Sequence, residues 1–322
     1  MVYGPVISWR LGRSLGIDVL LPPKTCTFDC IYCQLGRTIR RITSPEEFKP
    51  RVHLEDVISQ VEEALASLDT SFIDYITFSG CGEPTLHPEL GDMIEAVRGI
   101  CPQVPIAVLT NASLLWREDV LEGASRADLL VAKLDAPDST LFRIINRPVE
   151  GIDLPLVIQG LKEARRKVRG RLALQSMFLR ARGRPLNTAV FVLEKMAEII
   201  EEVKPYQVQV NTPTRPPAES YVQPLQAEEV SAVARALASR LEGVEVISWH
   251  PPEEEPLGLR ARDLRESVIG VLRRRPCRFH ELCSVSGHDP SLVRGLLDRL
   301  ISDGLVGIRT YRGERFYVLK RA

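Results

Sequence analysis

The stretch "KTCTFDCIYCQLGRT", Lys24 to Thr38, gathers three cysteines into one short loop. Three residues separate Cys26 from Cys30, two separate Cys30 from Cys33, and no fourth cysteine follows nearby. Three thiolates without a fourth suggest a metal centre that keeps one coordination position for an outside ligand. By spacing alone an iron–sulfur centre is favoured only modestly, and a zinc site with a distant fourth ligand is the alternative.

Around this loop, short apolar runs alternate with helix-period segments. We expect strands at Gly16–Leu21, Phe72–Gly80, Val104–Asn111, Ala127–Asp135, Leu172–Leu179 and Tyr206–Pro213. Amphipathic helices are expected between them, for example at Leu54–Leu68 and Asn187–Val203. Such βα units in series predict a parallel sheet with helices outside, either a complete or partial barrel or an open doubly wound sheet.

Unusual residues follow the expected strands at their carboxyl ends, where ligands of parallel sheets bind. The cysteine loop follows the first strand and "SGCGEPTLHPE" follows the second. Polar candidates on or after the later strands are Asn111, Lys133, Asp135, Gln175, Gln209 and Asn211. The alternative is structural, because such residues also cap helices, and Lys133 with Asp135 would then be an internal ion pair.

The segment "GCGEP", Gly80 to Pro84, has two interpretations. As a structural feature it is a strand-to-helix turn, in which glycine supplies positive φ and proline ends the strand. As a functional feature it adds backbone and the Glu83 carboxylate to the site beside the cysteine loop. Cys81 is interpreted as a small filler.

Composition limits the class of protein. The 322 residues are 44% hydrophobic, which suits one large core and a second small domain. Lys and Arg balance Asp and Glu at 42 each, although residues 261–322 carry 13 basic and 7 acidic residues. Seven cysteines form no disulfide framework, and neither a signal peptide nor a membrane span is evident, so we expect a cytoplasmic protein.

The last quarter of the chain changes character. A strand at Val244–Trp249 ends the barrel-like region of residues 1–250, and a Pro- and Glu-rich linker is expected at 251–260. Residues 261–322 predict three helices followed by a β-hairpin, which is a winged-helix pattern. In its third helix Asp289 caps, Pro290 takes the first turn and Gly304 ends the helix.

The three-cysteine spacing, with Tyr32 before the last cysteine and the Gly-Glu-Pro turn downstream, resembles the radical S-adenosylmethionine (SAM) superfamily. The stretches "YGPVISWRLGRSLGIDVLLPPKTCTFDCIYCQLGRT" and "FSGCGEPTLHPEL" are similar to an iron–sulfur oxidoreductase branch related to archaeal wyosine synthetase. The resemblance implies a partial (β/α)6 TIM-like barrel and a radical SAM enzyme. It also implies a reductant such as ferredoxin or flavodoxin.

By the same resemblance, Cys26, Cys30 and Cys33 hold three irons of a [4Fe-4S] cluster, and the fourth iron binds SAM. The expected cofactor-binding residues are Tyr32, Gly80, Gly82, Glu83, Asn111, Lys133, Asp135, Gln175 and Asn211. The radical formed from SAM would take hydrogen from a substrate that the sequence does not identify, with a peptide, a protein or an RNA as candidate classes.

Two other functions remain open at this point. A tRNA base modification of the wyosine type is weakened because no cysteine for a second cluster precedes Cys26. A winged-helix regulator with an iron–sulfur sensor is the alternative of another class, since basic residues could meet phosphates, among them Arg273, Arg274, Arg275, Arg309, Arg312 and Arg315. We favour substrate recruitment or packing against the barrel for the winged helix.

Two further clusters receive the structural interpretation. Arg37, Arg40 and Arg41 are expected to be a solvated basic loop. Cys277, His280, Cys283 and His288 fit no standard zinc spacing. The sequence indicates no oligomeric state.

Overall fold

An eight-stranded sheet forms the body of the protein in the computed structural model, which describes residues 1–66, 68–251 and 263–320. Seven strands run parallel, and the first pairs antiparallel with the second. The order is β1 (Val2–Ser8), β2 (Gly12–Ile17), β5 (Tyr75–Phe78), β6 (Ile106–Thr110), β7 (Leu129–Lys133), β8 (Arg171–Met177), β11 (Gln207–Asn211) and β13 (Glu245–Ser248). In this order β1 and β13 are opposite edges, so the sheet is a barrel that remains open.

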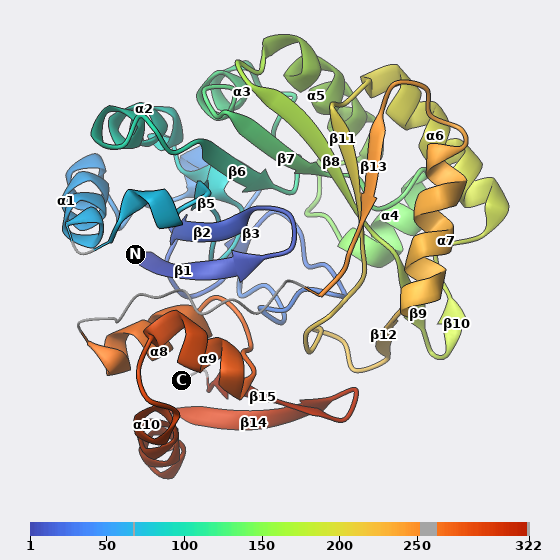
Figure 1. Ribbon diagram of the computed structural model, residues 1–322. Coiled ribbons are helices and arrows are strands. Elements are labelled where there is room, and N and C mark those ends of the chain that lie inside the picture. The colour runs from blue at the N-terminus through green and yellow to red at the C-terminus, as the bar shows by residue number, and fades with distance from the viewer. Residues whose placement is uncertain (67, 252–262, 321–322) are drawn as a thin grey trace.

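Helices connect the successive parallel strands and cover the outer face of the curved sheet (Figure 1). They are α1 (Leu54–Leu65), α2 (Leu90–Ile100), α3 (Glu118–Ala124), α4 (Ser139–Asn146), α5 (Leu154–Lys167), α6 (Val190–Val203) and α7 (Ala227–Ala238). The expected α/β architecture with a parallel sheet is thereby confirmed. One strand of the eight-stranded sheet was not expected: β1 precedes the first predicted strand, which itself begins at Gly12 instead of Gly16.

The two faces of the sheet bury different side chains because residues alternate along a strand. Ile106 and Val108 of β6 belong to the large core under the helices. Their neighbour Ala107 points to the inner face, together with Ala173 of β8. On this face they form a small cluster with Leu11, Leu129 and Val131.

After β13 the chain forms a separate group of helices and a hairpin, here called the C-terminal unit. It comprises α8 (Leu264–Leu272), α9 (Phe279–Ser286), α10 (Pro290–Ser302), β14 (Val306–Tyr311) and β15 (Glu314–Leu319). As expected, Asp289 caps α10 through the Ser291 amide, Pro290 opens the helix and Gly304 follows it at a φ of 73°. Apart from Pro251, the expected linker lies outside the described residues.

The C-terminal unit packs beneath β1 and β2, and one buried ion pair joins the two (Figure 1). Arg274 Nε lies 3.0 Å from Asp18 Oδ2, with side chains only 4% and 1% exposed. Asp18 Oδ1 also accepts hydrogen bonds from the backbone of Leu20, Leu21 and Cys81. One carboxylate therefore fixes the end of β2, the turn after β5 and the C-terminal unit together.

We expect Arg274→Gln to lower the free energy of unfolding by about 3–5 kcal/mol, because it leaves the Asp18 carboxylate buried without a countercharge. Urea unfolding of the full chain measures this change. Arg273→Gln is the matched control: its side chain is exposed and should stay within about 0.5 kcal/mol of the unmodified protein. An equal effect of both substitutions would contradict the assignment.

A second ion pair across this junction predicts a dependence on pH. Burial acts to raise the pKa of Glu281, but the Arg215 guanidinium and its hydrogen bonds prevail and lower it to about 2 from 4.5. The stabilisation is therefore complete above pH 4.5 and disappears as the pH falls toward 2. We compare the unfolding free energy of the unmodified protein with that of Glu281→Gln. The difference should be constant near neutral pH and should shrink below pH 4.5. A difference that does not change with pH would refute this origin.

Candidate functional site

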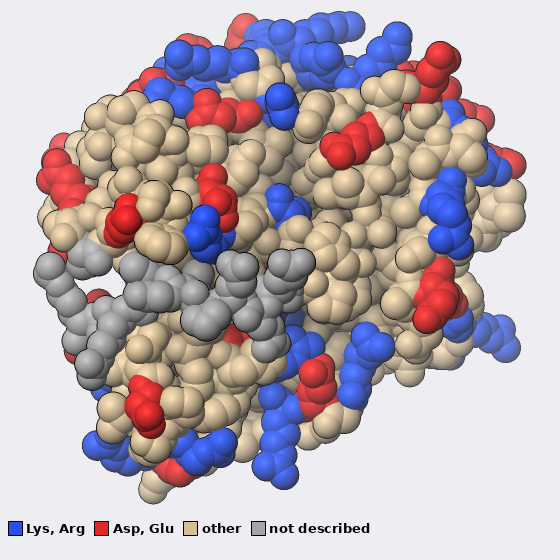
Figure 2. Space-filling view, viewed as in Figure 1, with Lys and Arg blue, Asp and Glu red and all other residues tan. Residues whose placement is uncertain are grey.

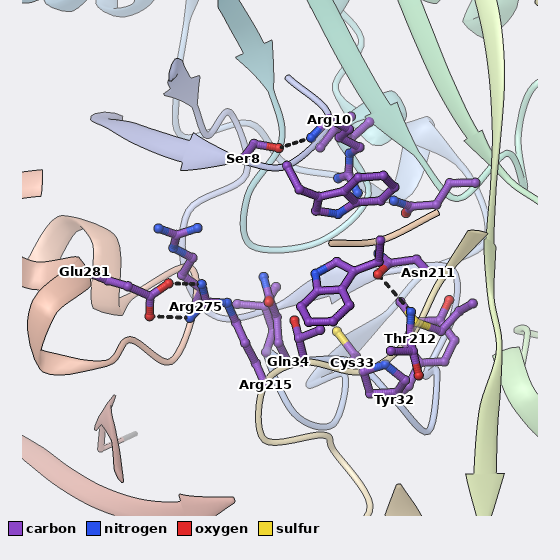
Figure 3. A pocket seen from close by; sticks show the side chains of 18 of the residues that line it. Ser8, Arg10, Tyr32, Cys33, Gln34, Asn211, Thr212, Arg215, Arg275 and Glu281 are labelled. Carbon is purple, nitrogen blue, oxygen red and sulfur yellow. Dashed lines mark hydrogen bonds and ion pairs between the residues drawn. The ribbon is translucent and has the colours of Figure 1, made fainter. Parts of the chain in front are cut away.

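A chamber of about 1270 Å³ opens at the carboxyl ends of the parallel strands. Its floor consists of inner-face side chains such as Leu109, Val131 and Gln175, and the cysteine loop forms one wall. The β1–β2 hairpin and the C-terminal unit supply further walls (Figure 3). A ligand site of drug size occupies about 300–1,000 Å³, so this chamber has room for more than one small molecule.

The cysteine loop presents all three predicted thiols to the chamber. Cys26, Cys30 and Cys33 line it and are free cysteines. Cys26 lies in the short strand β3 (Thr25–Cys26), which pairs with β4 (Arg40–Arg41). A turn in which the Cys33 amide donates to the Cys30 carbonyl brings the last two cysteines together.

Burial and one lysine control the charge of these thiols. Burial raises the pKa of Cys26 to about 11 and that of Cys30 to about 12. Lys24 is buried, and although burial opposes its charge, the three cysteines together raise its pKa. The amide groups of Asn111 and Asn146 donate to the sulfurs of Cys26 and Cys30, at 3.5 and 3.6 Å. The sulfurs therefore lie in a largely buried wall of the chamber, close to the Lys24 ammonium and to the N–H donors of Asn111 and Asn146.

The Gly-Cys-Gly-Glu-Pro turn packs directly on the cysteine loop. The Thr25 amide donates to the Cys81 carbonyl, and the Glu83 amide donates to the Thr25 carbonyl. Gly82 has a φ of 150°, and a Cβ there would lie 1.6 Å from the Thr25 carbonyl oxygen. Only glycine therefore permits this approach. Gly80 does not line the chamber; its missing side chain makes room for Asp18.

Glu83 lines the chamber, yet its buried carboxylate already has partners. It accepts hydrogen bonds from the backbone amide and the hydroxyl of Thr85, from the Thr110 hydroxyl and from the backbone amide of Asn111. Burial raises the pKa of Glu83 although these hydrogen bonds oppose the change. The side chain joins the ends of β5 and β6, a role that the sequence did not indicate.

Three other predicted residues form a compact group. Tyr32 Oη donates to Asp135, whose other oxygen lies 3.0 Å from Lys133 Nζ. Lys133 also stands 5.0 Å from the centre of the Tyr32 ring. Tyr32 and Lys133 line the chamber, whereas Asp135 is buried behind them. The structure therefore shows the ion pair that was the structural alternative for Lys133 and Asp135.

The remaining strand-end candidates divide into those that line the chamber and one that does not. Asn111, Gln175 and Asn211 line the chamber, as predicted from their positions. Gln209 is 1% exposed, donates to Gln207 and does not line the chamber. Gln209 stands in register with Gln175 of the neighbouring strand, so its level along the sheet does not decide its place. Its side chain bonds to Gln207 instead of reaching the chamber.

Sequence reasoning missed several residues of the site. Trp9 and Arg10 come from the unexpected hairpin, and Arg215 and Trp249 come from loops after β11 and β13. Arg275 of the C-terminal unit was expected only as part of a basic surface, and Figure 3 shows it beside Arg215 and Glu281. The alternating apolar run before Gly12 was the available signal for the hairpin. No local signal indicated that a segment so distant in sequence would close the site.

The minor clusters have simple environments. Arg37 pairs with Asp29 and Glu219, and Arg41 donates to the carbonyls of Arg147 and Pro148. In the part of the chain that the structure describes, no group of three or more Cys, His, Asp or Glu side chains lies close enough together to hold one metal ion. Cys277, His280, Cys283 and His288 therefore form no such group. Among the described helices, none has the length and apolar character needed to cross a membrane.

Comparisons with known proteins agree with this site. The family model of the radical SAM superfamily matches residues 20–179. The UPF0026 protein of Methanocaldococcus jannaschii is 32% identical over 99% of this chain and 95% of its own length. That of a Synechocystis species is 37% identical over 70% of this chain and 78% of its own length.

The solved structure of Streptococcus suis SuiB bound to S-adenosylmethionine superimposes with a TM-score of 0.53 and 14% identity, over 76% of this chain and 51% of SuiB. At that identity the likeness concerns the fold alone. The family match and the full-length relative together decide the membership: the chain belongs to the radical SAM superfamily and, within it, to the UPF0026 proteins.

Proposed function

We propose that Cys26, Cys30 and Cys33 hold the [4Fe-4S] cluster of this radical SAM enzyme, and that SAM and a second molecule, the substrate, share the chamber beside them. The observation that carries the proposal is the position of three free thiols on one wall of a chamber larger than a single small ligand needs. The enzyme then modifies the second molecule.

The residues fit a cluster better than they fit a single ion. Within the described ranges the three thiols do not converge on one metal-binding point. A [4Fe-4S] cluster takes one thiolate on each iron and so accepts thiols that stand apart. N–H donors directed at sulfur, as Asn111 and Asn146 provide, are among the features that set the potential of such clusters.

When bound, the cluster and SAM supply reductive cleavage of SAM to a 5′-deoxyadenosyl radical, which takes a hydrogen atom from the substrate. The protein residues provide the setting. Lys24 balances thiolate charge, while Phe28, Trp9 and Trp249 provide apolar walls that limit access of water. Gly82 and Asn111 line the chamber beside the cysteine loop and are the SAM contacts that we propose there.

Membership of an enzyme superfamily favours the enzyme over the regulator. Enzymes of this superfamily require a reductant, and a ferredoxin or flavodoxin is the donor that we propose. The tRNA-modifying reaction of the wyosine type stays an untested alternative. A C-terminal winged helix that helps to recruit the substrate is likewise a proposal, supported by the residues of the C-terminal unit that line the chamber.

Electron paramagnetic resonance tests the ligand set. We expect anaerobically reconstituted, dithionite-reduced protein to show a [4Fe-4S]⁺ signal that changes when SAM is added. Cys30→Ala should lose this signal and show no SAM cleavage above background, because one iron loses its ligand. Cys283→Ala is the matched control, since that free thiol also lines the chamber and should be dispensable. Retained SAM cleavage in reconstituted Cys30→Ala would overturn the assignment.

A second prediction concerns the turn that packs on the cysteine loop. Gly82→Ala should lower the unfolding free energy by about 3 kcal/mol or more and reduce iron incorporation, because its Cβ collides with the Thr25 carbonyl. Gly99→Ala in α2 has no atom within 4 Å of the added Cβ and should stabilise by about 0.5–1 kcal/mol. Thermal unfolding and iron analysis measure both, and normal iron content in Gly82→Ala would contradict the close approach.

A further inference from the structure

Hydrogen-bond donors without partners concentrate on the chamber. In the described part of the chain, eight buried side-chain polar atoms have no hydrogen-bond partner. Five of these belong to residues that line the chamber: Arg10 Nε, Gln175 Nε2, Arg275 Nε, Arg278 Nε and Ser284 Oγ. Four are N–H donors and the fifth is a hydroxyl. Since buried polar groups are normally paired, this set indicates a ligand rich in acceptors.

The charges of the chamber agree with this indication. Seven Lys and Arg residues line it against three Glu residues. Glu83 is held by its own hydrogen bonds, Glu281 pairs with Arg215 and Glu314 pairs with Arg278. Lys24 faces the thiols and Lys133 pairs with Asp135. Arg312 donates to the side chain of Gln226. Arg275 lies near enough to Glu281 to lower its pKa, but among the described residues neither Arg275 nor Arg10 has an ion pair of its own.

Arg10 is the more exceptional of these two cations. It extends from the turn between β1 and β2, and its guanidinium stands 6.0 Å from the centre of the Trp9 ring. The Arg10 side chain is half-buried, and its Nε is buried without a hydrogen-bond partner among the described residues. Burial lowers the pKa of Arg10 to about 10, and no charged group of the described residues counters this effect. A donor buried in this way is costly unless a ligand supplies an acceptor.

Arg275 approaches from the opposite part of the chain. It follows α8 in the C-terminal unit, and Figure 3 shows it near the Arg215–Glu281 pair, while Arg10 enters from the hairpin. Both reach the chamber that the cysteine loop also lines. A ligand beside the thiols therefore meets unpaired cations from two separate walls.

We infer that the substrate of this enzyme is an anionic molecule, with a phosphate or carboxylate group that binds Arg10 and further acceptors that face Arg275. The inference rests on the proposed function, since it assigns the second occupant of the same chamber. The chamber then places the neutral part of the substrate between this anionic end and the cysteine loop. Arg10 is a binding residue in this scheme.

Anaerobic isothermal titration calorimetry on the reconstituted full-length protein tests the inference. Saturating SAM is present without reductant, so no cleavage occurs and the SAM carboxylate is already bound. The probes are inorganic pyrophosphate, citrate and uncharged glucose. We expect at least one anion to bind saturably, with the stronger of the two identifying phosphate or carboxylate, and no binding of glucose.

Arg10→Gln should weaken the anion about tenfold or more, the expected loss of a charge-assisted hydrogen bond. Arg10→Lys should retain part of the affinity, which shows that the substituted wall still folds. Arg299→Gln on the exposed face of α10 is the matched control and should bind as the unmodified protein does.

Three results would overturn the inference. The first is no saturable binding of either anion, and the second is an affinity in Arg10→Gln equal to that of the unmodified protein. The third is anion binding that occurs without SAM and disappears with saturating SAM, which would assign Arg10 to the SAM carboxylate instead. The measurement requires no radical chemistry. Failure of SAM cleavage in the resonance experiment would thus count against the proposed function, while failure here counts against the anionic substrate alone.

Discussion

The buried carboxylate of Asp18 is the constraint on which the site depends. It ends β2, receives the backbone of the turn that follows β5, and pairs with Arg274 from the C-terminal unit. Gly80 is glycine because any side chain there would occupy the space of Asp18. The turn held in this way supports the cysteine loop through Thr25 and Gly82. The positions of the three thiols therefore follow from a charge pair that contains none of them.

The chamber has two electrostatic halves. Near the thiols the charged groups are paired: Tyr32, Lys133 and Asp135 form one group, and Glu83 accepts several hydrogen bonds. Such paired groups are rigid and suit the binding of a cofactor whose position must not vary. Between the hairpin and the C-terminal unit, the Nε donors of Arg10 and Arg275 have no partner among the described residues. This is the half to which we assign the anionic group of the substrate.

Sequence reasoning succeeded where the signal was local. The cysteine spacing gave the loop, and strand-length apolar runs gave the parallel sheet, since both depend on neighbours along the chain. It failed where contacts cross the chain. Arg274 and Asp18 are separated by 256 residues, and nothing near either indicates the other. Glu83 stays a predicted contact of the ligand, but the sequence could not show that its carboxylate also accepts hydrogen bonds from Thr110 and Asn111.

The basic excess of the C-terminal unit shows why net charge alone misleads about partners. Arg274 points inward to Asp18, Arg275 lines the chamber, Arg278 pairs with Glu314, and Arg294 lies 4.2 Å from the centre of the Phe279 ring. Figure 2 shows further Lys and Arg along the lower edge of the molecule, with acidic side chains among them. Phosphate recognition on a duplex requires outward cations on one face. Because several of these cations are directed at the barrel or at their own unit, the unit is better suited to closing the chamber than to reading nucleic acid.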